Sequence, residues 1–99
     1  MFVHIFTFRW KDEATPADKQ RAEAAIRRFD GQIDGLVSLM LGENQSSKSA
    51  QFTMTGIMMF ASHDAFERYV DHPLHAALLE WLVPLIDAFE LDFESQDTP

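Results

Sequence analysis

The sequence predicts an α+β fold with the element order β-α-β-β-α-β, the ferredoxin-like arrangement in which a four-stranded antiparallel sheet carries helices on one face. Segments rich in β-branched and aromatic residues begin and end the chain, and apolar stripes at helical spacing lie between strand-like segments. With 46% hydrophobic residues, the 99-residue chain can form one core, so residues 1–99 are predicted to be a single domain.

The first half of the chain is predicted to form a strand, a helix and a second strand. Residues 2–10 alternate, and one face of this strand carries Phe2, His4, Phe6, Phe8 and Trp10. Thr15 caps a helix, Pro16 fits its first position, and Gly31 marks its stop. The apolar stripe of this helix is Ala22, Ala25, Ile26 and Phe29. Residues 36–41 form the second strand, and a polar hairpin-like loop follows.

The second half is predicted to form a third strand at residues 52–60, two helical segments and a last strand at residues 89–94. Residues 62–64 cap a helix that carries Phe66, Tyr69 and Val70 on one face. Pro73 ends that helix and begins another, which Pro84 is expected to kink or shorten. The apolar stripe of this last helix is Leu74, Leu78, Leu79, Leu82 and Ile86. The last strand alternates between an acidic face and an apolar face of Phe89, Leu91 and Phe93.

Charge and composition exclude several classes of function. The net charge of −8 works against binding to nucleic acid or to anionic membranes, which both favour clustered Lys and Arg. The absence of cysteine excludes disulfides, a thiolate nucleophile and Cys-ligated metal sites. The first residues lack the features of a signal peptide, and Glu80 and Pro84 break the longest apolar run. We therefore expect a cytoplasmic protein that does not enter the membrane.

A homodimer is expected from the size of the chain. A domain of this length buries only about 60 to 65% of the surface that its unfolded chain exposes, so a broad apolar face tends to be covered by another subunit. With helices on one face only, the other face of the sheet must be solvated or paired. The aromatic content of the first and third strands favours pairing.

The segment YVDHPLH at residues 69–75 contains the single tyrosine and two of the four histidines. His75 follows a helix break, and from there its ring could act as a general base or lie as a polar group at the rim of the core. Tyr69 lies on the buried face of its helix, so its hydroxyl needs a partner. His72 is expected to cap the helix corner and His63 to be solvated. The proline disrupts the helical face that a histidine pair would need, so we expect no metal site.

Other residues suggest an apolar ligand pocket. His4 shares a strand face with Phe6 and Phe8, and a neutral imidazole in such a wall must form a hydrogen bond, for which a ligand is one option. The methionines of the middle strands can line an adaptable pocket or fill a core; they are Met40, Met54, Met58 and Met59. The sequence contains no nucleotide-binding loop, serine nucleophile motif or paired-carboxylate motif, and no cofactor is expected.

Four segments together resemble the stress-responsive dimeric α/β-barrel (Dabb) family. They are VHIFTFRWKDEAT, IDGLVSL, LGEN and YVDHPLH, and the resemblance covers nearly the whole chain. It implies a ferredoxin-like subunit whose open sheet face pairs with a second copy to close a two-subunit dimeric α/β barrel.

Within that family, the Y-x-x-H-P-x-H pattern is similar to that of the olivetolic acid cyclase type of polyketide cyclase, which uses neither cofactor nor metal. The resemblance implies that His75 is the base and Tyr69 the hydrogen-bonding partner. The substrate-binding residues would be His4, Phe6, Phe8 and Met54. Where such a cyclase has a further histidine in its third strand, this chain has Met54, so the pocket would be less polar.

Three functions remain open at this point. The first is a cofactor-independent cyclase or lyase-type enzyme acting on a small β-keto or polyketide-like compound. The second is a noncatalytic stress-response homodimer that binds a small apolar ligand. The third is a cofactor-free monooxygenase of a related barrel type, which shares the dimeric barrel but not the HPxH segment.

Overall fold

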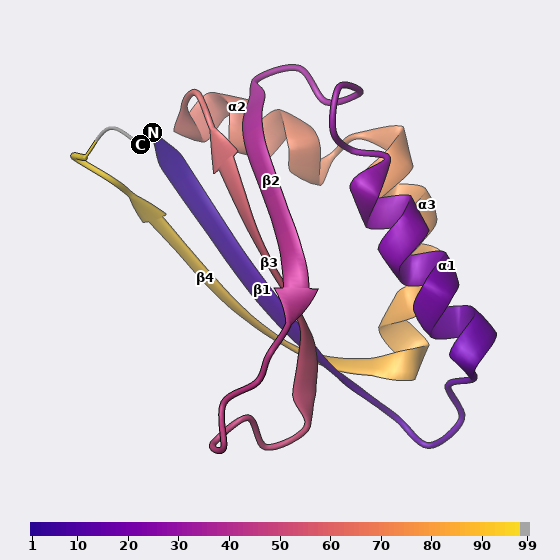
Figure 1. Cartoon of the computed structure of the whole chain (residues 1–99). Coiled ribbons are helices and arrows are strands. Elements are labelled where there is room, and N and C mark those ends of the chain that lie inside the picture. The colour runs from indigo at the N-terminus through magenta and orange to yellow at the C-terminus, as the bar shows by residue number, and fades with distance from the viewer. Residues whose placement is uncertain (98–99) are drawn as a thin grey trace.

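A four-stranded antiparallel sheet forms one layer of the protein, and helices pack against one of its faces (Figure 1). The computed structural model describes residues 1–97. Its elements are β1 (Phe2–Trp10), α1 (Pro16–Arg27), β2 (Leu36–Glu43), β3 (Phe52–Phe60), α2 (His63–Val70), α3 (Pro73–Leu82), the 3-10 turn η1 (Val83–Leu85) and β4 (Ile86–Glu94). The strand order is β2-β3-β1-β4, so the predicted ferredoxin-like fold is confirmed.

Side-chain caps begin all three α-helices. The Thr15 hydroxyl accepts a hydrogen bond from the Asp18 N–H at 3.1 Å, and the Asp18 carboxylate accepts one from the Thr15 N–H at 2.9 Å. These hydrogen bonds to Thr15 hold the pKa of Asp18 below its ordinary value. Ser62 caps α2, and His72 caps α3 by accepting a hydrogen bond from the Leu74 N–H at 3.1 Å. The expected capping role of His72 is confirmed.

Some element boundaries differ from the predictions. The helix α1 ends at Arg27 rather than at Gly31, because the chain already turns at residues 28–30 before the glycine adopts its φ of +79°. The strand β2 continues to Glu43, and β4 begins at Ile86 instead of residue 89. The longer strands extend the sheet at the end where the chain enters β4.

The second helical region also differs in detail. Pro84 shortens it as expected, because α3 ends at Leu82 and η1 follows. Ile86 is therefore not on the helical stripe but is the first residue of β4. Val70 is exposed, since one residue of helix turns it about 100° away from the buried Tyr69. Leu79, on the flank of α3, is exposed as well.

The core lies between the helices and the side of the sheet that faces them. The largest fully buried side chains are Phe29, Phe60, Ile26, Met58 and Leu82. Burial of each stabilises the fold by about 1.5 to 3 kcal/mol relative to an exposed side chain. The helix-facing side of β1 supplies Phe2, Phe6 and Phe8 to this core, as its alternation predicts.

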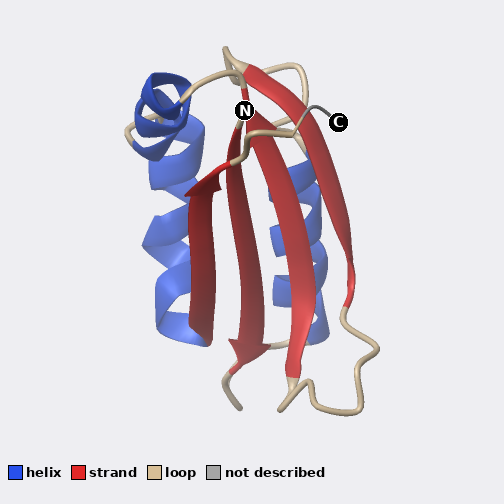
Figure 2. Cartoon of the chain, turned by 90° about the vertical axis from the view of Figure 1, so that its left-hand side faces the viewer, coloured by secondary structure: helices blue, strands red, loops and turns tan. Residues whose placement is uncertain are grey.

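Within residues 1–97, all helices lie on one side of the sheet and its other face is left open (Figure 2). The apolar side of β4 lies on this open face, because Phe89 and Leu91 pair with Thr7 and Ile5 of β1. The exposed fractions of the side chains on this apolar side are 57% for Phe89, 50% for Leu91 and 48% for Phe93. The sequence predicted that this side would be the buried one, and within one chain it is not. The acidic side of β4 instead faces the helices.

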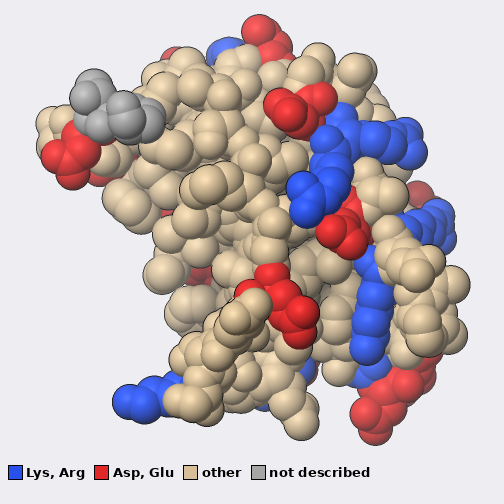
Figure 3. Space-filling model, in the orientation of Figure 1, with Lys and Arg blue, Asp and Glu red and all other residues tan. Residues whose placement is uncertain are grey.

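Charged groups are distributed unevenly over the surface. Lys and Arg side chains gather in Figure 3 over the side of the molecule that α1 occupies in Figure 1, and the flank formed by the sheet is largely uncharged in that view.

No helix within residues 1–97 is long and apolar enough to cross a bilayer.

Gly56 allows β1 and β3 to pack closely. It lies opposite Phe6, and a Cβ at this position would be 2.2 Å from Cζ of the Phe6 ring. We expect Gly56→Ala to lower the free energy of unfolding by about 1 to 3 kcal/mol, because the buried ring must move. Urea unfolding of the two proteins measures the difference.

Gly42 in β2 provides the matched control, since within residues 1–97 no atom beyond its two chain neighbours lies within 4 Å of a Cβ built there. Gly42→Ala should change the free energy of unfolding by no more than about 0.5 kcal/mol. Equal effects of the two substitutions would contradict the close packing of Phe6 on Gly56.

Candidate functional site

A cavity of about 110 Å³ lies between the helices and the side of the sheet formed by β1 and β4. Its wall is mainly apolar and includes Phe6, Phe8, Ile26, Phe29, Leu78 and Leu82. Four polar side chains also line it, namely His4, Tyr69, His75 and Glu90. An apolar lining with a few convergent polar groups is typical of ligand-binding sites, although this cavity is smaller than most of them.

His75 and Tyr69 lie side by side in this cavity, with ring centroids 4.4 Å apart. Pro73 begins α3 and so places His75 in the first turn of that helix, where its Nδ1 lies 2.9 Å from the carbonyl oxygen of Val70. A carbonyl only accepts hydrogen bonds, so Nδ1 carries the proton and Nε2 of the neutral ring has a free lone pair. Burial lowers the pKa of His75 below its ordinary value, although the hydrogen bond to Val70 opposes this shift. His75 is therefore a neutral base at pH 7.

Tyr69 is 4% exposed, and its ring packs between Phe29 and Phe60. Burial raises the pKa of the Tyr69 hydroxyl above its ordinary value, and the negative charge of Glu90 adds to the effect. The hydroxyl forms no hydrogen bond within residues 1–97, and no side-chain polar atom of that range is both inaccessible and unpartnered. Because Tyr69 lines the cavity, its protonated hydroxyl is available there as a hydrogen-bond donor.

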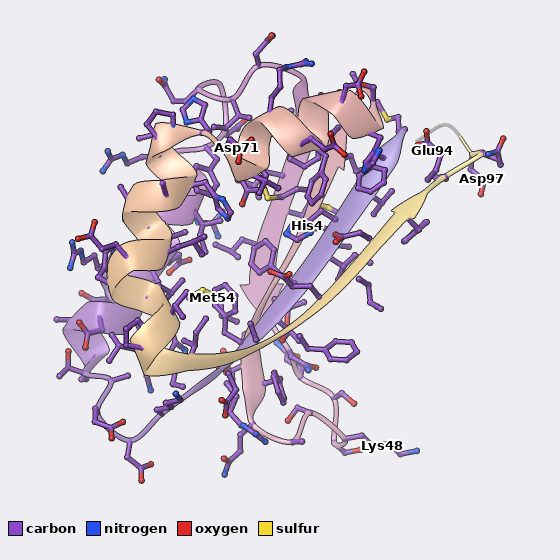
Figure 4. The ribbon with its side chains drawn as sticks, turned by 180° about the vertical axis from the view of Figure 1, so that it is seen from behind. His4, Lys48, Met54, Asp71, Glu94 and Asp97 are labelled. Carbon is purple, nitrogen blue, oxygen red and sulfur yellow. The ribbon has the colours of Figure 1, made fainter. Side chains whose placement is uncertain are left out.

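His4 reaches the cavity from β1, on the side of the sheet that the helices cover (Figure 4). Its Nδ1 lies 2.5 Å from Oδ1 of Asp92, its cross-strand partner on β4. The carboxylate accepts this hydrogen bond, so it orients the ring and holds a proton on Nδ1. The ring of His4 also lies beside those of Phe66 and Tyr69, with centroid distances of 5.1 Å and 6.2 Å.

Five of the six predicted site residues line this cavity: His4, Phe6, Phe8, Tyr69 and His75. Met54 does not. It lines a separate hollow with Trp10 and Lys19, because it lies on β3, and β1 separates β3 from the cavity beside β4. Figure 4 shows Met54 and His4 at different heights along the sheet.

The sequence prediction missed Glu90, which lines the cavity, and Asp92, which contacts His4. The alternation of the last strand places them on one face, but it does not say whether that face meets the helices or points away. The pairing of Glu90 with Phe6 and of Asp92 with His4 decides this, because Phe6 and His4 point toward the helices.

The other histidines lie outside the cavity. His63 is exposed, as expected of a solvated residue. Its Nε2 lies 3.4 Å from Oε1 of Glu67, one turn further along α2. His72 uses its Nδ1 to cap α3. Within the described part of the chain, no three His, Cys, Asp or Glu side chains are close enough together to bind a metal ion.

Proteins of known structure share this fold. A dimeric ferredoxin-like protein of unknown function from Thermobifida fusca is 26% identical, with a TM-score of 0.81 over 93% of this chain and 88% of its own. SnoaB, a cofactor-independent oxygenase from Streptomyces nogalater, is 20% identical, with a TM-score of 0.74 over 98% of this chain and 94% of its own. A hydroxynitrile lyase from Passiflora edulis is 14% identical, with a TM-score of 0.79 over 99% of this chain and 96% of its own.

No match is found among curated proteins. The sequence model of the stress responsive A/B barrel domain family, Dabb, matches residues 2–95. Those residues contain every element of the fold and every residue of the cavity, and the protein therefore belongs to the Dabb family.

Proposed function

We propose that this protein is a cofactor-independent enzyme that removes a proton from a small carbonyl compound, with His75 as the base and Tyr69 as the hydrogen-bond donor. The observation that carries the proposal is the contact of these two rings inside an apolar cavity, where His75 offers a lone pair and Tyr69 offers an O–H. A base and a donor with these roles are sufficient for enolate chemistry.

The reaction begins when Nε2 of His75 takes a proton from the carbon next to a carbonyl group. The electron pair of the broken C–H bond forms a C=C bond, and the carbonyl oxygen becomes an enolate oxygen. The Tyr69 hydroxyl donates a hydrogen bond to that oxygen as its charge develops. His4, oriented by Asp92, contacts the substrate from the strand side.

The enolate carbon can then attack a second carbonyl group, and the proton on His75 returns to the alkoxide that forms. This sequence is an aldol ring closure, and its reverse is a lyase reaction. A β-keto compound suits the site best, because the carbon between two carbonyl groups is the most acidic. The oxygenase and the lyase described above support the proposal by analogy of fold, since their shared architecture accommodates more than one chemistry.

A noncatalytic ligand-binding protein is the second candidate, and the predominantly apolar wall of the cavity favours it. Such a protein would use Tyr69 and His75 only to orient a ligand. The cofactor-free monooxygenase alternative is supported by fold alone.

We further propose that the protein is a homodimer that pairs the open faces of two sheets into a barrel. The exposed apolar side chains of β2 and β4 support this, because a monomer would leave Met40, Phe89, Leu91 and Phe93 in water. The Thermobifida fusca protein described as dimeric has the same fold.

The proposed base can be tested by exchange of the α-protons of butan-2-one with solvent D₂O, followed by NMR. We expect His75→Ala and Tyr69→Phe each to slow the protein-catalysed exchange by about 100-fold or more. His63→Ala serves as the control and should exchange at the wild-type rate, since His63 lies outside the cavity. Circular dichroism checks that each variant folds. Wild-type exchange no faster than in buffer would exclude the catalytic proposal and favour the ligand-binding one.

The lowered pKa of His75 has a consequence for stability. As the pH falls below about 6.5, the unfolded chain binds a proton at this residue before the folded chain does. The stability that the fold gains from keeping the His75 ring neutral is therefore fully present above about pH 6.5. It is lost as the pH falls through the pKa of His75 in the folded state. His75→Gln should lose less stability than the wild type between pH 7 and pH 5.

Urea unfolding at each pH measures that difference. The histidine ring resonance that is present in the NMR spectrum of wild type and missing in that of His75→Gln belongs to His75. In wild type, the midpoint of its titration should lie below about pH 6.5. A midpoint at or above that value would contradict the burial of the ring.

The dimer is tested by light scattering. Wild-type protein at micromolar concentration should have a mass near twice the 11.3 kDa of one chain, and Leu91→Glu should have the mass of one chain. Val70→Glu introduces the same charge at an exposed apolar residue of α2 and should remain dimeric. Dissociation by both substitutions, or by neither, would argue against an interface on the open sheet face.

A further inference from the structure

We propose that Glu90 is a specificity residue that restricts the cavity to small ligands without negative charge and excludes carboxylates. This inference rests on the proposed function in one respect, namely that the cavity is the ligand site. It narrows the substrate class from carbonyl compounds in general to uncharged or cationic ones.

The volume of the cavity limits the size of the ligand. A cavity of about 150 Å³ holds one benzene molecule, so the 110 Å³ here has room for a group of about four non-hydrogen atoms. A longer substrate would have to extend through the opening. The part that reacts beside Tyr69 and His75 is therefore small.

Glu90 lies at the opening of the cavity. Four residues of the cavity lining are exposed to solvent, and they mark this opening. Leu79 and Val83 lie at the end of the helical region, and Ala88 and Glu90 lie on β4. Because β4 is an edge strand, no further strand of the described residues covers this side. A ligand that enters between α3 and β4 passes the carboxylate of Glu90.

The negative charge of Glu90 is not neutralised within the described residues. On the same side of β4, Asp92 bonds His4, and Glu94 lies 3.6 Å from the N-terminal amino group. Glu90 has neither a hydrogen bond nor an ion pair with any group in residues 1–97, and no Lys or Arg of that range lines the cavity. Glu90 is exposed, so water partly screens its charge, but a carboxylate ligand that enters the mainly apolar cavity loses solvent and meets this charge at close range.

The other polar groups of the cavity do not offset that repulsion. Burial keeps His75 neutral at pH 7, so its ring supplies no positive charge. The Tyr69 hydroxyl is a neutral donor, and His4 already donates to a carboxylate. The Tyr69 hydroxyl can donate to a carbonyl oxygen, which only accepts hydrogen bonds, and a ligand hydroxyl could in addition donate to the free lone pair of His75. Neither kind of group brings a charge.

Two probes of equal carbon number test the inference. Butan-2-one and butanoate are titrated at pH 7.5 into wild type, Glu90→Gln and Glu94→Gln, and the ring resonances of Tyr69 and His75 are followed by NMR. We expect wild type to bind butan-2-one at least about tenfold more tightly than butanoate. Glu90→Gln should shift the ratio of the two affinities by about tenfold in favour of butanoate.

Glu94→Gln is the matched control, because Glu94 lies on the same side of β4 but does not line the cavity. It should retain the wild-type preference. Equal binding of the two probes to wild type, or an unchanged preference in Glu90→Gln, would overturn the role of Glu90 and leave the proposed chemistry intact. Absence of shifts with both probes would overturn the inference together with the cavity as a ligand site. Failure of the exchange experiment alone, with selective binding retained, would overturn only the proposed catalysis.

Discussion

The antiparallel pairing of β1 with β4 is the constraint on which the site depends. It joins the two ends of the chain, so that His4 and Asp92, which are 88 positions apart, are direct neighbours. A shift of one residue in this register would exchange the two faces of β4 and replace Glu90 and Asp92 by apolar side chains. The position of Glu90 in the cavity wall, the contact of Asp92 with His4 and the exposed apolar face of β4 all follow from this single register.

The corner at Pro73 supplies the other half of the site. Proline cannot continue α2 but fits the first turn of α3, and His72 satisfies the backbone at that junction. The sharp change of direction brings the ring of His75 back against Tyr69 and lets the Val70 carbonyl hold its Nδ1 proton. Backbone groups freed by the end of one helix thus fix the protonation of a side chain in the next.

Much of the fold could be predicted because its signals are local. Caps at Thr15 and Ser62 and the alternation of the strands depend on nearby residues. The pairing of Tyr69 with His75 is implied by the resemblance of the YVDHPLH segment to the Dabb family. The sequence could not show which face of the last strand meets the helices. That choice depends on contacts distant in sequence, and it explains why Glu90 and Asp92 were not predicted. The same kind of distant contact places Met54 and His4 in different hollows, with β1 between β3 and β4.

The strict alternation along β4 also separates two kinds of change that a protein family can accumulate. Residues 90 and 92 face the cavity side, and residues 89 and 91 face away from it, although only one peptide bond divides them. Substitutions at even positions can alter the chemistry of the pocket while the outer surface stays the same, and substitutions at odd positions can do the reverse. A single strand therefore lets ligand preference and surface recognition diverge independently over time.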